Sequence, residues 1–127
     1  MKESAVVVGL DGSPLYWHLP QGRTAVSIPD TRDLWDVLWE HRANLSGVAH
    51  SHPGSGRPTP SQTDLTTFSA IEAGLGQRFN WWICNSDQVI VIRWSEDAKL
   101  YQARTWDSVS EPSRWLEQLR HNSFDPR

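Results

Sequence analysis

The sequence is poor in cysteine and lacks both a long apolar run and a cluster of basic residues. Its one cysteine, Cys84, cannot form an internal disulfide, which is typical of proteins in a reducing compartment. No apolar stretch approaches the roughly 18 residues that a membrane-spanning helix needs, and residues 1–12 lack the basic, apolar and small-residue order of a secretory signal. We therefore expect a soluble protein of the cytoplasm that has no membrane partner.

Charge is nearly balanced along the chain. The 12 Lys and Arg residues are scattered among 15 Asp and Glu residues, which leaves a net charge of −3 and a pI near 5.9. Because nucleic-acid binding domains normally carry a clustered basic face, this distribution argues against a nucleic-acid partner. The 127 residues suffice for one domain with a single core, which we place at residues 1–122, with residues 123–127 as a frayed tail.

Strand and helix patterns alternate along the chain without repeats or a low-complexity linker. Short β-branched and aromatic segments between turn residues predict strands over residues 4–10, 15–20, 24–29, 47–52, 79–84, 89–94 and 99–106. Apolar residues at helical spacing predict helices from Asp30 or Thr31 to about residue 43, from Ser61 to residue 76, and over residues 111–122. This order predicts an α+β fold, similar to an α/β/α sandwich, with helices packed on a mixed, mostly antiparallel sheet.

The same patterns predict where several single side chains lie. Trp81 and Trp82 are neighbours on a strand and must face opposite sides, so we expect at most one of them in the core. His18 and His41 have no partner at metal-ligand spacing and are expected at the surface or on a helix flank. Cys84 is expected to pack in the core, because no histidine is placed to act as its base.

The segment "GVAHSHPGSGRPTPSQTDL", residues 47–65, brings two histidines, a hydroxyl and a carboxylate close together in sequence. In an extended strand His50 and His52 point to the same face, because side chains alternate with period two. Asp64, in the first turn of the next helix, can supply a third ligand. Three protein ligands leave one position open for water, which distinguishes catalytic from structural zinc sites. The segment therefore predicts a catalytic zinc site.

Ser61 stands three residues before Asp64 and can donate a hydroxyl hydrogen bond to a developing oxyanion. Taken singly, these residues have simpler explanations: Ser61 as a helix N-cap, Asp64 as an acid that suits the helix dipole, and one histidine as a surface residue. The joint pattern favours a metal site over the separate explanations.

The pattern "HSHPGSGRPTPSQTD" resembles the signature of the JAMM (MPN+, JAB domain) zinc metalloproteases of the compact prokaryotic or phage type, and the resemblance extends over residues 3 to about 95. It implies a JAB/MPN-like fold of the cytidine-deaminase-like kind and one zinc ion per chain, held by His50, His52 and Asp64. It also implies that Ser61 stabilises the oxyanion and that Glu3 is the general base. The eight residues between His52 and Ser61 are one more than is usual in the family, and the glycines and prolines there absorb the extra residue at small cost.

The resemblance implies hydrolysis of an amide or isopeptide bond at the C-terminal tail of a ubiquitin-like protein or its conjugate, with the tail bound as an added β-strand. The chain runs almost directly from the helix that contains Asp64 into "FNWWIC", which leaves little room for the second insertion of eukaryotic deubiquitinating relatives. Two alternatives stay open: a non-catalytic MPN-type scaffold or binding module, and a JAB-like domain associated with DNA repair. The oligomeric state stays open as well.

Overall fold

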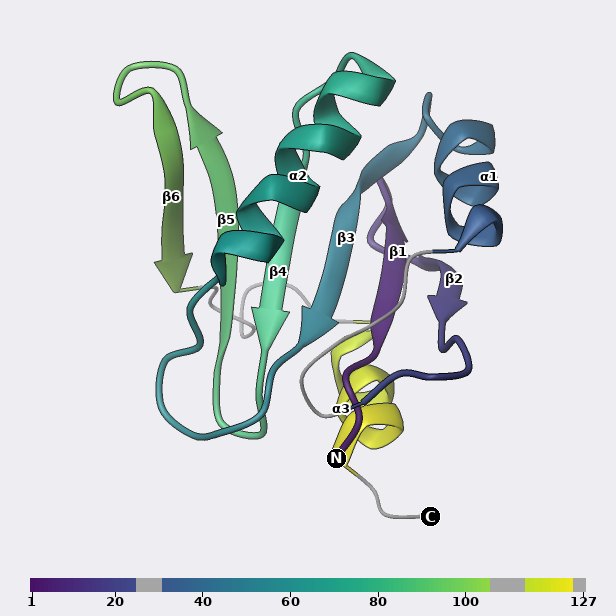
Figure 1. The fold of residues 1–127 in the computed structure, drawn as a ribbon, viewed down its shortest axis with the longest axis vertical. Helices are drawn as coiled ribbons and strands as arrows, with labels where there is room; N and C mark the ends of the chain where they lie inside the picture. The colour runs from purple at the N-terminus through teal and green to yellow at the C-terminus, as the bar shows by residue number, and fades with distance from the viewer. Residues whose placement is uncertain (25–30, 106–113, 125–127) are drawn as a thin grey trace.

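A single mixed sheet with helices on both of its faces forms the part of the chain that the computed structural model describes, residues 1–24, 31–105 and 114–124 (Figure 1). The strands lie in the order β2-β1-β3-β4-β5-β6, and neighbours are antiparallel except for the parallel pair β3 and β4. In chain order the elements are β1 (Ala5–Gly9), β2 (Pro14–His18), α1 (Arg32–Glu40), β3 (Leu45–Ser51), α2 (Gln62–Leu75), β4 (Asn80–Cys84), β5 (Val89–Ser95), β6 (Leu100–Thr105) and α3 (Leu116–Phe124). The predicted α+β fold is confirmed.

Each face of the sheet has its own apolar core, because strand side chains alternate between the two faces. Val7 and Ile83 pack under α1 and α2, whereas Val6 and Val8 pack under α3, on the opposite face (Figure 1). Since helices cover both faces, all five residues of β1 are buried. Such a strand has an almost continuous apolar sequence, as "AVVVG" does.

The expectation that at most one of Trp81 and Trp82 lies in the core is wrong. Trp81 stacks on Phe68 of α2 with ring centroids 4.4 Å apart, and Trp82 packs on Trp115, just before α3, at 5.4 Å. The two tryptophans are 2 % and 8 % exposed. They do face opposite sides of the sheet, as predicted, but α3 provides a second core that the strand pattern alone does not indicate.

A buried carboxylate ties α2 to β4. The side chain of Glu72 is 2 % exposed and pairs with Arg78, whose Nη1 lies 2.9 Å from Oε1. Its Oε2 accepts hydrogen bonds from the backbone N–H of Phe79 at 2.9 Å and from the indole N–H of Trp81 at 3.0 Å, while the Tyr101 hydroxyl donates to Oε1. This set of donors fixes the far end of α2 against the sheet.

Most of the observed boundaries lie within a few residues of the predicted ones, and two of the differences involve buried residues. β3 begins at Leu45, two residues before the predicted start, because Leu45 is buried and pairs with Gly9 of β1. The helix at the C-terminal side runs to Phe124, so Ser123 does not belong to a frayed tail, and it is 2 % exposed. The strand predicted over residues 24–29 lies, except for Thr24, outside the described residues, as do residues 106–113 and 125–127. None of the three described helices is long and apolar enough to cross a membrane.

Candidate metal centre

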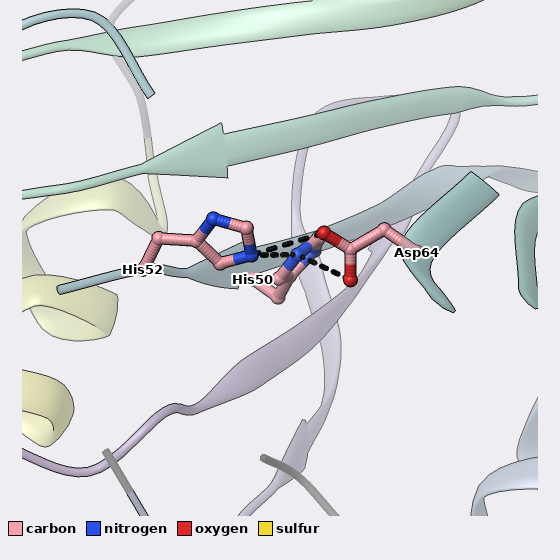
Figure 2. A group of neighbouring side chains, drawn as sticks. All are labelled: His50, His52 and Asp64. Carbon is pink, nitrogen blue, oxygen red and sulfur yellow. Dashed lines mark hydrogen bonds and ion pairs between the residues drawn. The ribbon is translucent and has the colours of Figure 1, made fainter. Parts of the chain in front are cut away.

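The two histidines lie at the carboxyl end of β3, where the strand leaves the sheet. His50 is the next-to-last residue of the strand and pairs with Ala5 of β1 on one side and Ile83 of β4 on the other. His52 follows the strand, and its backbone N–H donates to the carbonyl oxygen of Cys84 at 2.8 Å. The extended backbone directs both rings to the same face, and their Nε2 atoms lie 3.0 Å apart (Figure 2).

Asp64 approaches the histidines from the first turn of α2, across the loop that follows β3 (Figure 2). Its Oδ1 lies 3.4 Å from Nε2 of His50, and its Oδ2 lies 3.0 Å from Nε2 of His52. One nitrogen of each ring and one carboxylate oxygen all lie within 4.8 Å of one another. Three possible ligands from two elements therefore converge on one point, as the spacing in the sequence predicts.

The donor atoms fit a zinc ion. Tetrahedral zinc binds imidazole nitrogen and carboxylate oxygen at about 2.0–2.2 Å, so two of its ligand atoms lie about 3.3–3.5 Å apart. The two Nε2 atoms lie 3.0 Å apart and lie 3.4 and 3.0 Å from different oxygens of the Asp64 carboxylate, and sets of one atom from each residue lie within 4.8 Å. Two imidazoles with one carboxylate are a ligand set of catalytic zinc sites, which keep the fourth position open. These residues could hold one such ion with little rearrangement.

The surroundings shift the pKa values of two of the three residues, Asp64 and His52, in opposite directions. Burial alone raises the pKa of Asp64, but hydrogen bonds from His50 and His52 and from the backbone of Ser61 hold it well below its usual range. Burial lowers the pKa of His52, yet its hydrogen bond to Asp64, the nearby charge of Glu3 and a hydrogen bond with the backbone of Thr59 together raise it. The Asp64 carboxylate is therefore ionised, and a cation bound at this point would compete with the proton of the His52 imidazole.

Ser61 is the N-cap of α2 and makes a capping box with Asp64. The Ser61 hydroxyl oxygen accepts from the backbone N–H of Asp64 at 3.0 Å, and the Asp64 carboxylate accepts from the backbone N–H of Ser61 at 2.9 Å. Since the hydroxyl acts as an acceptor toward the helix, its own proton stays available to another acceptor. Ser61 also lines the cavity beside the histidines. It therefore caps α2 and lies next to the candidate metal centre.

Glu3 lies just before β1, and pairing with β3 brings it to the same edge of the sheet. Its Oε1 is 3.7 Å from Nε2 of His52, and the residue is 7 % exposed. Burial raises the pKa of Glu3, and the neighbouring charges of His50 and His52 oppose this rise only in part. The structure thus brings together all five residues that the sequence and the resemblance selected.

A cavity of about 580 Å³ adjoins the ligands and opens between α1, α2 and the sheet. The ligands and Ser61 line it together with apolar side chains that include Leu34, Val48, Phe68 and Ile71. His18 also lines the cavity and is 2 % exposed, so its expected position at the surface is wrong. The alternation in "PLYWH" could have indicated this, because His18 shares a face with Tyr16, which packs against the same core.

The loop between His52 and Ser61 is attached near its middle to the turn between β4 and β5. The backbone N–H of Gly56 donates to the Asp87 carboxylate at 3.2 Å, and the Gly56 carbonyl accepts from the Asn85 side-chain amide at 2.8 Å. Arg57 adds a contact with the carbonyl oxygen of Ala103 in β6 at 3.4 Å. These bonds limit the freedom of a glycine-rich loop between two parts of the site.

Cys84 is not part of the site. It is buried in the core under α3, on the opposite face from the histidine rings, as expected for a packing residue. Burial raises the pKa of its thiol to about 12. A thiol with such a pKa is almost wholly protonated near neutral pH and is a poor nucleophile.

The mixed sheet between helices, with two imidazoles and a carboxylate at one strand end, defines an α+β domain with a candidate metal centre. Compared with models of protein families, residues 4–108 match the prokaryotic homologs of the JAB domain. The chain therefore belongs to this family, which confirms the resemblance noted from the His-x-His pattern. No curated protein sequence matches the chain. Glu3 and the whole of α3 lie outside the matched residues.

Proposed function

We propose that this chain is a zinc-dependent hydrolase that cleaves an amide or isopeptide bond. The observation that carries the proposal is the convergence of two Nε2 atoms and a carboxylate, 3.0–3.4 Å apart, at the wall of a cavity. A zinc ion held by His50, His52 and Asp64 supplies a Lewis acid that polarises a carbonyl and lowers the pKa of a water molecule toward neutrality. Membership of the JAB-domain family supports this assignment.

Glu3 and Ser61 perform the remaining steps in this proposal. The Glu3 carboxylate accepts a proton from the attacking water and delivers it to the leaving amine. Its buried position suits this role, because burial favours the protonated form through which the transfer must pass. The Ser61 hydroxyl, whose oxygen accepts from the helix backbone, donates to the oxyanion that develops on the scissile carbonyl.

The substrate that we propose is the C-terminal tail of a small ubiquitin-like protein, or a conjugate of that tail, in the cytoplasm. Only residues 76–79 connect α2 to β4, so the chain has no segment there that could wrap around a large partner. Such a compact form suits a slender, extended tail that binds through its backbone and places a few side chains in pockets. The apolar walls of the cavity beside the site provide such a pocket.

Metal content and hydrolysis together test the proposal. Protein purified without a metal-affinity tag should bind about one zinc ion per chain, as measured by elemental mass spectrometry, and His52→Ala should lose it. A small ubiquitin-like protein fused through its tail to a reporter should then be cleaved at the tail. Glu3→Gln should slow the cleavage by about 100-fold or more while the zinc content stays unchanged.

The alternatives predict other outcomes of the same experiments. Zinc-loaded wild-type protein that binds ubiquitin-like proteins but cleaves none of their fusions would support the non-catalytic binding module. Salt-dependent binding to DNA would support the domain associated with DNA repair. Absence of zinc from the wild type, even after zinc is offered near neutral pH, would refute the metal site itself.

A further inference from the structure

The backbone of Glu3 is held by Arg23 and Thr24, and Arg23 also contacts the C-terminal helix. The backbone N–H of Glu3 donates to the carbonyl oxygen of Thr24 at 2.7 Å. The Arg23 guanidinium donates to the Ser4 hydroxyl, and its Nη1 lies 3.5 Å from the carbonyl oxygen of Glu3. The same Nη1 lies 3.3 Å from the carbonyl oxygen of Asn122 in α3. Arg23 thus connects the segment that carries Glu3 to the last turn of the C-terminal helix.

A second connection runs through buried serines. Ser51 stands between the two histidines, and its side chain points to the opposite face, where its hydroxyl oxygen accepts from the backbone N–H of Ser4 at 2.9 Å. The hydroxyl oxygens of Ser51 and Ser123 lie 2.8 Å apart, and both residues are at most 2 % exposed. The carbonyl oxygen of Ser123 in turn accepts from the backbone N–H of Lys2 at 3.0 Å. Of the two neighbours of Glu3, Ser4 is therefore bonded to Ser51 and Lys2 to Ser123.

The helix that provides these contacts is itself firmly placed. Trp115, Leu116 and Leu119 pack into the core under the sheet, and Figure 1 shows α3 beside the N-terminal end of the chain. Arg120 adds a hydrogen bond from Nε to the carbonyl oxygen of Asn85 at 2.9 Å. The last turn of α3 thus offers a rigid support behind the segment that precedes β1.

From these contacts we propose that Arg23 and Ser123 are positioning residues for Glu3, and that α3 acts as a clamp on the catalytic base. Glu3 precedes β1, so contacts outside the strand ladder must hold its side chain in place, and a misplacement of about 1 Å can cost about 100-fold in rate. Ser51, the last residue of β3, connects the same clamp to the backbone between His50 and His52, so the base and the two histidines share one support. The catalytic consequence rests on the hydrolase function proposed above, whereas the clamp itself does not.

Steady-state kinetics of the full-length protein test the catalytic consequence. Arg23→Ala and Ser123→Ala should each lower kcat by about tenfold or more, with KM, zinc content and the circular dichroism spectrum unchanged. Arg23→Lys, which keeps a charged donor, should recover part of the loss. Ser69→Ala, at an exposed position of α2, makes the same chemical change as Ser123→Ala away from the clamp and should leave kcat unchanged. A kcat within twofold of the wild type in both clamp variants, or a loss that only follows lost zinc or lost fold, would overturn the proposal.

Amide hydrogen exchange tests the clamp without any need for activity. In Ser123→Ala and Arg23→Ala, the amide protons of Glu3 and Ser4 should exchange at least about tenfold faster than in the wild type, while those of α2 keep their rates. Equal rates at Glu3 and Ser4 in all variants would show that α3 does not hold this segment. If the wild type cleaves none of the fusion substrates, and the amide protons of Glu3 and Ser4 still exchange faster in the variants, the proposed hydrolase function fails and the clamp stands.

Discussion

Zinc should raise the unfolding temperature of the wild-type protein, and removal of one ligand should abolish this effect. The ligand atoms of His50, His52 and Asp64 are already gathered within 4.8 Å, so zinc binds the folded chain at little cost in rearrangement. The unfolded chain scatters these ligands and binds weakly. A ligand that binds only the folded state at a free concentration of 100 times its Kd stabilises that state by about 2.7 kcal/mol.

For a chain of 127 residues, each kcal/mol moves the unfolding temperature by about 4 °C, so the expected rise is about 10 °C. Thermal unfolding followed by circular dichroism, with zinc and then with excess chelator, measures this shift. His52→Ala should shift by less than about 2 °C, because two of the three donors remain. His41→Ala serves as the control, since His41 caps α1 through its backbone N–H and should keep the full shift.

The reasoning would be refuted by a zinc-dependent shift of equal size in the wild type and in His52→Ala, because the metal would then bind elsewhere. It would also be refuted by the absence of a shift in the wild type near neutral pH, where the imidazoles can release their protons. A loss of the shift in His41→Ala would show that the effect comes from surface histidines rather than from the site.

Three further predictions concern single side chains. Ser61→Ala should destabilise the protein by about 1 kcal/mol in urea unfolding, because the N-cap of α2 is lost. The same variant should keep the zinc-dependent thermal shift but lower kcat by about 100-fold, and an unchanged kcat would argue against the oxyanion role of Ser61. Glu72→Ala should lower the free energy of unfolding by about 3 kcal/mol in the same assay, because the buried N–H groups of Phe79 and Trp81 lose their acceptor. A decrease of less than about 1 kcal/mol would contradict the observed hydrogen bonds. Cys84 should react with a thiol reagent about 1000-fold more slowly in the folded protein than in the denatured one, because burial raises the pKa of its thiol to about 12. Rapid labelling of the folded protein would contradict this prediction and show that the thiol is accessible.

The three ligands could be predicted from the sequence because they are local. His50 and His52 follow the period of a strand, and Asp64 lies in the first turn of the next helix, so strand geometry, a short loop and helix capping suffice to bring them together. Glu3 is different, because it lies far from the histidines in sequence. It reaches them through the antiparallel pairing of Ala5 with His50, which no spacing rule predicts, and only the family resemblance pointed to it.

The errors in the prediction also have a physical cause. A strand pattern shows which side chains share a face, but it does not show what covers that face. The expectations for the Trp81–Trp82 pair and for His18 are wrong for this reason, since the covering elements, α3 and the α1–α2 layer, come from other parts of the chain. The expected frayed tail includes Ser123 because the buried partner of Ser123, Ser51, is distant in sequence.

The attachment of Gly56 to the turn between β4 and β5 has a consequence for changes in the length of the loop before Ser61. It divides the eight residues between His52 and Ser61 into two short spans, residues 53–55 and 57–60, that meet at a fixed point. A change in the length of the first span can be absorbed there, because Gly56 stays attached and the distance from Gly56 to Ser61 is unaltered. The length of the first span and the geometry of the candidate site can therefore vary independently, and insertions before Gly56 should be tolerated far better than insertions after it.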